Sequence, residues 1–349
     1  MQVERFSKYQ GKGHTGLANV GNSCYVNSCI QCLSHTYPLN DFLDTKTYED
    51  RLNNKPDSSL LVEWDNLRIM MWNQNCTIAP HGFINAIQKV AHAKGHQIFT
   101  GNAQNDLQEF LLFMIECFHN AISRSVDMAV TGDVKNLTDG MAVECYKMMS
   151  NMYENDYSEM IKLFYGIHVS SITSTETSET LSMRPEPFFV LSVALPSSQE
   201  NRVTLISCIE DFCKKDRLSG DNAWFNEKTN KKQDVDKSVA FWNFPEILII
   251  HLKRWDYQGK KDQRLVTMPM DSLDLTRYVN GYNQLEYIYE LYGICNHHGG
   301  VSGGHYTATI KVANGEWYVF NDASVTKIDQ EKVIGPSAYC LFFRKKNSK

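Results

Sequence analysis

The chain has 349 residues, of which 42% are hydrophobic and 21% charged, and its formal net charge is −5. This composition can bury a full core, and the acidic balance gives no general attraction to nucleic acid or to an anionic membrane. No apolar run approaches the roughly 20 residues that cross a bilayer, and the first 16 residues lack the apolar segment of a secretory signal. Neither nucleic acid nor a membrane is therefore an expected partner, and we expect a cytoplasmic or nuclear location, or both.

The ten cysteines are scattered along the chain without the dense spacing of a disulfide scaffold, which fits a reducing compartment. Most lie in apolar stretches, where a free cysteine behaves as a small buried hydrophobic residue. Cys29 and Cys32 have CxxC spacing, but no second CxxC exists and both fall on successive turns of a predicted helix. We interpret them as core residues and not as metal ligands or a redox pair.

The hydrophobic period changes from helical to strand-like along the chain. Helix-like clusters occupy 24–35, 60–72, 81–92, 107–122 and 160–166. Strand-like runs occupy 187–196, 246–255, 287–295, 306–312, 316–320 and 338–345. The polar segments 170–180 and 214–237 are interpreted as loops or an exposed subdomain. The pattern predicts an α+β fold with a helical first half and one substantial sheet in the second.

Asn314 and Gly315 stand between two of these strand-like runs. An Asn-Gly pair in this position is typical of a type I′ hairpin, in which both central residues have positive φ. The predicted hairpin brings the start of one strand, at His305, to the same end of the sheet as Asn321.

Cys24 is the candidate nucleophile. It follows a loop rich in glycine and asparagine and begins a predicted helix, whose free N–H groups and dipole would lower the thiol pKa from about 8.5 toward about 4–7. The side-chain amide of Asn19 is placed to donate to an oxyanion. The alternative is that Cys24 is one more buried thiol and that the loop is only a turn.

His305 is the candidate general base, because it begins a strand directly after a glycine-rich loop. Asn321 and Asp322 end the neighbouring strand, and either could accept a hydrogen bond from one imidazole nitrogen and turn the other toward the thiol. The expected geometry favours Asn321 over Asp322 as this orienting residue. The loop glycines would let a thin peptide pass close to His305.

Several ordered segments resemble one known family. GLANVGNSCYVNSCIQCL (16–33) is similar to the cysteine box of the ubiquitin-specific proteases, and YGICNHHGGVSGGHYTATI with WYVFNDASV is similar to their histidine box. QNDLQEF (104–110) resembles the box that lies between them, and NDYSEMIKLFYG, RPEPFFVLSVALP and EILIIHLKRW also match in order. The resemblance covers about residues 15–345.

The resemblance implies a papain-like fold with a helical thumb, a β-rich palm and a fingers subdomain. The expected organisation is an N-terminal extension, 1–14, and one catalytic domain, 15–345, with the thumb at about 15–165 and the fingers and palm at about 166–345. Carried over by position, Cys24 is the nucleophile, His305 the base, Asn321 the third member of the triad and Asn19 an oxyanion donor. Asp322 is the next candidate for the third member.

The same resemblance implies a binding site for the basic, glycine-terminated tail of ubiquitin. Gln104 and Asp106 match the residues that bind the tail, and Glu109 is placed to assist. Glu109 has a second interpretation, as an acidic residue in the first turn of a helix. Tyr306, Gly303 and Gly304 would line the narrow channel, and the segments 255–264 and 299–304 correspond to loops that close over the tail.

The chain departs from the family in its fingers. Many relatives bind zinc there through two CxxC pairs, but the aligned positions here are Thr173, Glu176, Asn226 and Thr229. Zinc requires several soft or imidazole ligands close together. We therefore predict no structural zinc and no other cofactor, and fingers that are shorter or more mobile than in zinc-bearing relatives.

The expected activity is removal of ubiquitin from a lysine amine through a Cys24 thioester, with ubiquitin, polyubiquitin and ubiquitinated proteins as partners. Two alternatives stay open. A protease for a ubiquitin-like modifier would have a similar tail site, and an inactive ubiquitin-binding scaffold would keep the fold without the chemistry. The sequence indicates no oligomeric state, chain-linkage preference or substrate protein.

Overall fold

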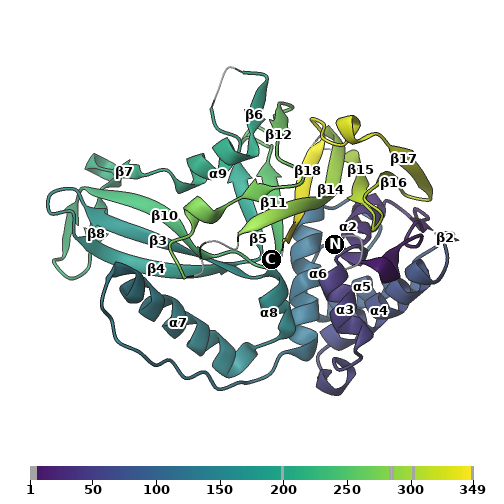
Figure 1. The fold of residues 1–349 in the computed structure, drawn as a ribbon, viewed down its shortest axis with the longest axis horizontal. Helices are drawn as coiled ribbons and strands as arrows, with labels where there is room; N and C mark the ends of the chain where they lie inside the picture. Colours follow the sequence, from purple (N-terminus) through teal and green to yellow (C-terminus); the bar gives the residue numbers. More distant parts are fainter. Residues whose placement is uncertain (1–5, 198–199, 283, 285–286, 301–302, 347–349) are drawn as a thin grey trace.

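The computed structural model of the chain describes residues 6–197, 200–282, 284, 287–300 and 303–346. The N-terminal helices gather at one end of the molecule, a large sheet packs over them, and a smaller sheet extends to the other end with one further long helix along it (Figure 1). The predicted order of a helical part followed by a strand-rich part is confirmed. The active-site segments meet where the helical part packs against the large sheet.

The five predicted helices are all present. They are α2 (Cys24–Ser34), α4 (Asp57–Asn73), α5 (His81–Ala93), α6 (Leu107–Ile122) and α8 (Glu159–Phe164). Helix α6 lies at the centre and packs against α2, α4 and α8. Its residues are almost continuously apolar, as expected of a helix surrounded on most sides by protein. This packing holds α2, and with it Cys24, at the boundary with the sheet.

Three α-helices were missing from the sequence prediction. They are α3 (Tyr37–Asp44), α7 (Leu137–Asp156) and α9 (Leu205–Cys213). Helix α7 has an apolar stripe at helical spacing, from Met141 and Ala142 to Met152 and Tyr153, that the prediction missed, although only Ala142 and Cys145 are buried. Its start carries a second signal, a capping box in which Asn136 and Asp139 exchange side-chain and backbone hydrogen bonds.

The large sheet carries the C-terminal part of the active site. Its strands, in spatial order, are β17 (Ser324–Ile328), β16 (Trp317–Asn321), β15 (Gly303–Lys311), β14 (Ile288–Gly300), β18 (Ala338–Lys345), β11 (Ile247–Lys253) and β5 (Val190–Ala194), and β13 (Leu273–Asp274) pairs with β14. Neighbours are antiparallel except β5 and β11. Helix α2 packs against β14, β15 and β16. Strands β15 and β16 therefore lie against the helix that begins at Cys24.

The predicted hairpin joins β15 and β16, but its turn type was predicted wrongly. Gly315 has φ +88°, whereas the φ of Asn314 is not positive, so the turn is not type I′. The Gly315 N–H donates to the Val312 carbonyl at 2.8 Å, and the Val312 N–H donates to the Glu316 carbonyl at 2.9 Å. A longer loop with one left-handed glycine closes the hairpin and still aligns the two strands.

The smaller sheet contains β4 (Thr180–Phe188), β3 (Gly166–Ser174), β10 (Val235–Asn243) and β7 (Asp216–Leu218), in that order. A hairpin of β8 (Trp224–Asn226) and β9 (Lys231–Gln233) lies beside it. The polar segments 170–180 and 214–237 thus contribute strands, and the simpler interpretation of them as loops was wrong. Only Phe188 of β4 is buried, which explains why its sequence lacks the alternation of a half-buried strand.

The positions aligned with zinc ligands serve the pairing of these strands. Thr173 lies between Thr180 and Asp236 in the register of the sheet. Asn226 donates its side-chain amide to Gln233 Oε1 at 3.3 Å. Within the described ranges, no group of three or more His, Cys, Asp or Glu residues is arranged to hold a metal ion.

The remaining strands form two short pairs. β1 (Gly16–Leu17) pairs with β2 (Thr77–Ile78), and β6 (Arg202–Thr204) pairs with β12 (Leu265–Thr267). Over the part of the chain that the structure describes, every helix is too short or too polar to cross a membrane.

Cys29 and Cys32 are fully buried, as predicted. They lie on the buried side of α2, where the Cys32 sulfur is 3.5 Å from that of Cys295 on β14. Burial raises the pKa of both thiols, so they remain protonated core groups at neutral pH.

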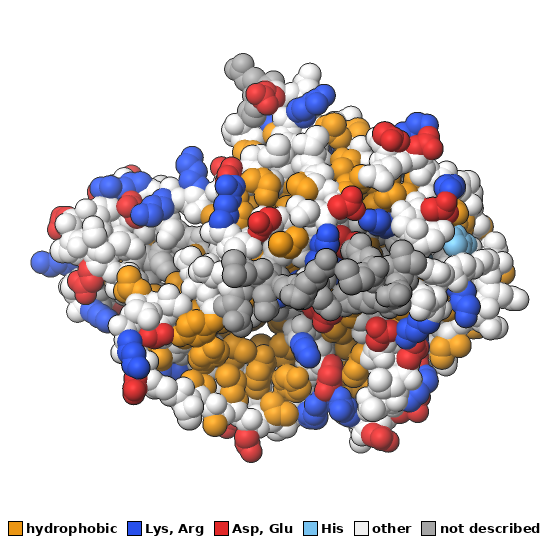
Figure 2. All heavy atoms as spheres, viewed as in Figure 1, with side chains coloured by type: hydrophobic (Ala, Val, Ile, Leu, Met, Phe, Trp, Pro, Cys, Tyr) orange, Lys and Arg blue, Asp and Glu red, His pale blue; other side chains and the backbone are white. Residues whose placement is uncertain are grey.

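A cavity of 780 Å³ lies away from Cys24, between α7, α8 and the start of β11. Figure 2 shows hydrophobic side chains gathered over α7 on the lower part of the viewed face. Met149, Met152 and Tyr153 of α7 line this cavity. None of the candidate catalytic residues contributes to it.

Candidate active site

Cys24 is the first residue of α2 and is only 3% exposed. The backbone N–H groups of Tyr306, Tyr25 and Cys24 itself lie near its thiol, and each of them lowers the thiol pKa. Burial outweighs them, and the nearby Asp322 carboxylate acts in the same direction, so the pKa of Cys24 is raised. The expectation that the start of the helix lowers the pKa of the Cys24 thiol is therefore wrong. A base must remove the proton.

His305 lies on β15 next to the residue whose N–H contacts the Cys24 thiol. Its Nε2 is 2.7 Å from Oδ1 of Asn321, at the end of β16. An amide oxygen can only accept, so Nε2 carries the proton and Nδ1 is the unprotonated nitrogen of the neutral ring. Asn321 thus orients His305 with Nδ1 left free, and β15, which carries His305, packs against α2; proton transfer from the Cys24 thiol to Nδ1 stays a prediction.

Asp322 does not contact the imidazole through any hydrogen bond within the described residues; it binds two asparagines instead. Its Oδ2 accepts from Nδ2 of Asn19 at 3.0 Å, and its Oδ1 accepts from Nδ2 of Asn27 at 2.7 Å. Oδ1 of Asn19 in turn accepts from the Ser23 N–H at 3.1 Å. Asn19 is thus held at both ends of its amide, which leaves one N–H of Nδ2 for an oxyanion.

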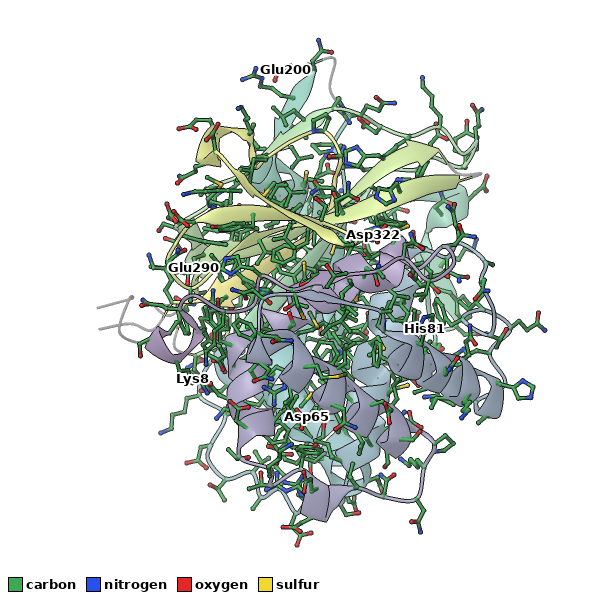
Figure 3. The ribbon with its side chains drawn as sticks, turned by 90° about the vertical axis from the view of Figure 1, so that its right-hand side faces the viewer. Lys8, Asp65, His81, Glu200, Glu290 and Asp322 are labelled. Atoms are coloured by element: carbon green, nitrogen blue, oxygen red, sulfur yellow. The ribbon has the colours of Figure 1, made fainter. Side chains whose placement is uncertain are left out.

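A tight contact joins the end of β16 to the loop before Cys24. Asp322 adopts a left-handed φ of +49°, and its carbonyl accepts from the Leu17 N–H at 2.9 Å. A Cβ on Gly16 would lie 2.2 Å from the Ala323 carbonyl oxygen, so only glycine fits there. Figure 3 shows Asp322 at the boundary between the N-terminal helices and the C-terminal strands. The contact fixes the position of Asn19 relative to β16.

Replacing Asp322 with asparagine tests this arrangement. Asparagine tolerates the left-handed conformation, but one of its two end atoms is a donor, so Asn19 or Asn27 loses its acceptor. We expect kcat to fall about 10- to 100-fold, since removal of a whole oxyanion donor costs about 10²- to 10³-fold and here the donor is only displaced. KM should change little. The measurement is steady-state hydrolysis of a fluorogenic ubiquitin C-terminal amide.

Asn321→Ala is the matched comparison, because it removes the imidazole contact and leaves the Asp322 network intact. If Asp322 were the residue that orients His305, Asn321→Ala would be nearly silent. If Asp322 had no positioning role, Asp322→Asn would keep more than half of the parent kcat. Either result contradicts the roles drawn from these distances.

A channel-like cavity of 520 Å³ leads from the surface toward this site. On one side it is lined by Gln104, Asn105 and Asp106, and on the other by the loop around Trp255. The glycines of the β14–β15 hairpin, His297 and Tyr306 form its floor and end. Positions 301 and 302 of the predicted mobile loop lie outside the described residues.

Gln104 spans the channel. Its Nε2 donates to the Gly304 carbonyl at 3.2 Å, and its Oε1 accepts from the Gly304 N–H at 3.2 Å. A side-chain amide thus occupies the place of a neighbouring peptide group along β15. A Cβ on Gly304 would lie 2.3 Å from Nε2 of His297, which explains the glycine. Gly303 is exposed beside it.

Asp106 is the N-cap of α6. Its Oδ1 accepts from the N–H groups of Gln108 at 2.8 Å and Glu109 at 3.2 Å. Its Oδ2 accepts from the Tyr339 hydroxyl at 2.6 Å. Both oxygens are therefore engaged in the free protein, and a role of Asp106 in binding a basic tail stays a prediction.

Asp106→Ala should destabilise the fold. Loss of an N-cap and of a charge-assisted hydrogen bond from Tyr339 is expected to lower the free energy of unfolding by about 2 kcal/mol. Glu109→Ala is the control on the same helix turn, since Glu109 is exposed and should change stability by less than about 0.5 kcal/mol. Urea unfolding followed by circular dichroism measures both. Equal stabilities of the two variants would contradict the capping role.

Tyr306 joins α6 to β15. It is 8% exposed, and the Leu107 N–H donates to its hydroxyl at 3.5 Å. Its ring lies 4.6 Å from that of His297 between centroids. Burial, followed by the Lys261 ammonium, lowers the pKa of His297 to about 4, so this histidine is neutral at physiological pH.

Asn27 and His297 were not predicted from the sequence to be site residues. Asn27 lies three residues after Cys24, on the next turn of α2, and that spacing is the signal that could have identified it. His297 could not be separated from its neighbour His298 without the pairing register of β14 and β15.

The sequence profile and the named relatives that match this chain belong to the same family. Residues 15–343 match the sequence profile of the family described as "Ubiquitin carboxyl-terminal hydrolase". The chain is 33% identical over 341 residues to the human protein named ubiquitin carboxyl-terminal hydrolase 2, covering 95% of this chain and 55% of that protein. It is also 33% identical over 341 residues to the Drosophila melanogaster protein named Usp2, covering 96% of this chain and 35% of the other. The chain thus spans about half, or less, of the length of these relatives.

Solved structures support the papain-like arrangement of thumb, palm and fingers. A SAGA DUB module of Ubp8, Sgf11, Sus1 and Sgf73 bound to monoubiquitin matches with a TM-score of 0.75 at 24% identity, over 98% of this chain and 71% of the other. The same module bound to ubiquitin aldehyde matches with a TM-score of 0.74 at 24% identity, over 98% and 71%. At these identities the likeness establishes the fold alone.

Proposed function

Because this chain belongs to the ubiquitin carboxyl-terminal hydrolase family, we propose that it is a deubiquitinating cysteine isopeptidase. It would hydrolyse the bond between the C-terminal glycine of ubiquitin and a lysine amine. The observation that carries this proposal is the arrangement of His305, whose Nε2 is held by Asn321 while the next residue along the strand contacts the Cys24 thiol.

In the first half of the proposed reaction, Nδ1 of His305 takes the proton of the Cys24 thiol as the sulfur attacks the glycine carbonyl. Burial raises the thiol pKa, so this transfer is coupled to substrate binding and not completed beforehand. The oxyanion accepts from Nδ2 of Asn19 and from a backbone N–H at the start of α2. The imidazolium then protonates the leaving lysine amine, which departs and leaves a thioester.

In the second half, water attacks the thioester carbonyl. His305 removes the proton of the water and returns it to the departing Cys24 sulfur, which regenerates the enzyme. Asn321 keeps the ring in one orientation throughout both steps. Because Asn321 is neutral, it orients the ring without placing a charge beside it.

The tail of the modifier would enter through the 520 Å³ channel. An extended Gly-Gly backbone can replace the amide of Gln104 at Gly304, since the two offer the same donor and acceptor pattern. Glu109, exposed in the first turn of α6, would attract basic residues of the tail. Complexes of structurally similar proteins with monoubiquitin and ubiquitin aldehyde support ubiquitin as the modifier.

We also propose that residues 15–345 act as one catalytic unit, with residues 1–14 as an extension. Ten unpaired cysteines fit a reducing cytoplasmic or nuclear location. The expected partners are ubiquitin, polyubiquitin and proteins that carry them.

The proposal is tested with a panel of fluorogenic C-terminal amides made on ubiquitin and on ubiquitin-like modifiers. We expect kcat/KM for the ubiquitin derivative to be at least about 10²-fold above that for the others, because contacts with the folded part of ubiquitin add to the affinity for its tail. Faster hydrolysis of another modifier would reassign the substrate. Binding of ubiquitin without turnover on any derivative would identify an inactive scaffold.

A further inference from the structure

A second cavity, of 430 Å³, lies beside the tail channel and shares Trp255 and Asp256 with it. The loop 255–264 therefore has the channel on one side and this cavity on the other. The charged residues that line the cavity are Lys253, Arg254, Lys260, Lys261, Asp256 and Asp262. Cations outnumber carboxylates there.

Arg254 is the buried cation of this cavity, with only 1% of its surface exposed. Its Nε donates to the Ala338 carbonyl at 2.6 Å, and its Nη1 donates to the carbonyls of Asp262 and Arg264, both at 2.9 Å. Its Nη2 is buried and has no hydrogen-bond partner. A buried guanidinium held only by neutral oxygens, with one nitrogen unsatisfied, carries an uncompensated desolvation cost.

The two carboxylates of the cavity are already engaged. The Asp262 carboxylate is bound by the Arg264 guanidinium, with Oδ2 and Nη2 2.6 Å apart. Oδ1 of Asp256 accepts from the N–H groups of Gln258 at 2.9 Å and Lys260 at 2.8 Å. Neither carboxylate forms an ion pair with Arg254 among the described residues.

The lysines of the cavity differ in their contacts. Lys261 donates to His297, at 3.0 Å from the ring Nδ1 and 2.6 Å from the carbonyl. Lys253, at the end of β11, and Lys260, in the loop, are exposed. Within the described ranges no side-chain hydrogen bond or ion pair engages their ammonium groups. They add two exposed cations at the rim of the cavity, and Arg254 is the buried cation below them.

We propose that this cavity binds a phosphoryl group, free or carried on a phosphomonoester, with Arg254 Nη2 as the buried donor and Lys253 and Lys260 at the rim. A tetrahedral oxyanion offers several acceptors to donors that converge from different sides, and a guanidinium gives up its hydration more readily than an ammonium. The cavity is large enough for the phosphoryl group and part of the molecule that carries it.

Occupation of the site would hold Trp255 and Asp256 at the wall of the tail channel. The position that loop 255–264 has here would then be its favoured state, so that entry of the tail has only to displace the Gln104 side chain. This consequence rests on the proposed deubiquitinating function, whereas anion binding itself does not. The two are therefore measured separately.

The binding experiment titrates the full chain with inorganic phosphate, and in parallel with a phosphoserine peptide, by isothermal calorimetry at constant ionic strength. We expect saturable binding that Lys253→Ala and Lys260→Ala each weaken about fivefold, as loss of one partly exposed charge contact does. Lys215→Ala, which removes an exposed lysine before β7, is the control and should bind as the parent does. The arm with the lower Kd identifies the free or the carried phosphoryl group as the ligand.

No saturable binding in either arm, or equal weakening by Lys215→Ala, would overturn the proposal. Arg254→Lys adds a second test that removes the Nη2 donor. Because it also removes carbonyl contacts, it is interpreted only together with its unfolding curve, and the lysine variants decide if it does not fold.

The activity experiment measures hydrolysis of a ubiquitin C-terminal amide with and without saturating phosphate. We expect KM to fall about two- to threefold with kcat unchanged, the gain available when a partly populated loop state is made dominant. Lys260→Ala should need about fivefold more phosphate to give the same shift. Binding without any change in KM would leave the anion site in place and contradict its coupling to the channel.

Discussion

Cys24→Ala is expected to lower kcat/KM for a ubiquitin C-terminal amide by at least about 10⁴-fold, because the change removes the atom that forms the thioester. Neither the oxyanion donors nor the tail channel can replace a nucleophile. The variant should still bind ubiquitin with nearly the parent affinity, since Cys24 is buried and contributes little surface. Hydrolysis is followed by fluorescence, and ubiquitin binding is measured by calorimetry.

Cys213→Ala is the matched control, because this half-buried free cysteine lies at the end of α9, away from the site. Its activity should stay within about twofold of the parent, as for most substitutions outside a functional site. A Cys24→Ala protein that keeps more than about 1% of the parent kcat/KM would mean that another group performs the attack.

His305→Ala is expected to lower kcat by about 10³- to 10⁴-fold at pH 7, because the change removes the base that takes the thiol proton. Its pH dependence is more specific than the loss itself. Burial raises the pKa of the Cys24 thiol, so below that pKa the thiolate fraction increases about tenfold for each pH unit. The residual activity of the variant should therefore rise steadily from pH 6.5 to 8.5.

His298→Ala is the control for this prediction. His298 is the register partner of His305 across β14 and β15, so it has the same chemistry on the same face of the sheet. It makes no hydrogen bond to Asn321 among the described residues, and we expect its loss to cost less than tenfold. A flat pH profile for His305→Ala would show that the thiol is already ionised without the base.

The parts of the site that the sequence predicted are those tied to local chain geometry. Cys24 could be placed at a helix start because a loop of small residues precedes an apolar period. His305 and Asn321 could be placed at one end of the sheet because a hairpin joins their strands, even though its turn type was predicted wrongly. The order of helices and strands followed from the same change of period.

The features of the site that could not be predicted from the sequence depend on tertiary contacts. The raised pKa of Cys24 results from burial under β15 and from Asp322, which lies 298 positions further along the chain. The role of Asp322 follows from its left-handed φ, which turns the carboxylate toward Asn19 and Asn27 and leaves Asn321 to the imidazole. Neither the raised pKa of Cys24 nor the role of Asp322 can be inferred from the local hydrophobic period of the sequence.

The capping role of Asp106 shows the same limit. Its position before an apolar helix indicates an N-cap, but the hydrogen bond from Tyr339 comes from β18, at the far end of the chain. A residue matched to tail binding by resemblance is thus also a structural residue. The stability measurement separates the two roles.

The central claim is that Cys24 is the nucleophile toward the C-terminus of ubiquitin. The most direct measurement is incubation of the full chain, under reducing conditions, with ubiquitin that carries a C-terminal electrophile, followed by intact-mass and peptide mass spectrometry. We expect one stoichiometric adduct, on Cys24, which does not form in Cys24→Ala and forms more slowly in His305→Ala. No adduct, or an adduct on another of the ten cysteines, would contradict it.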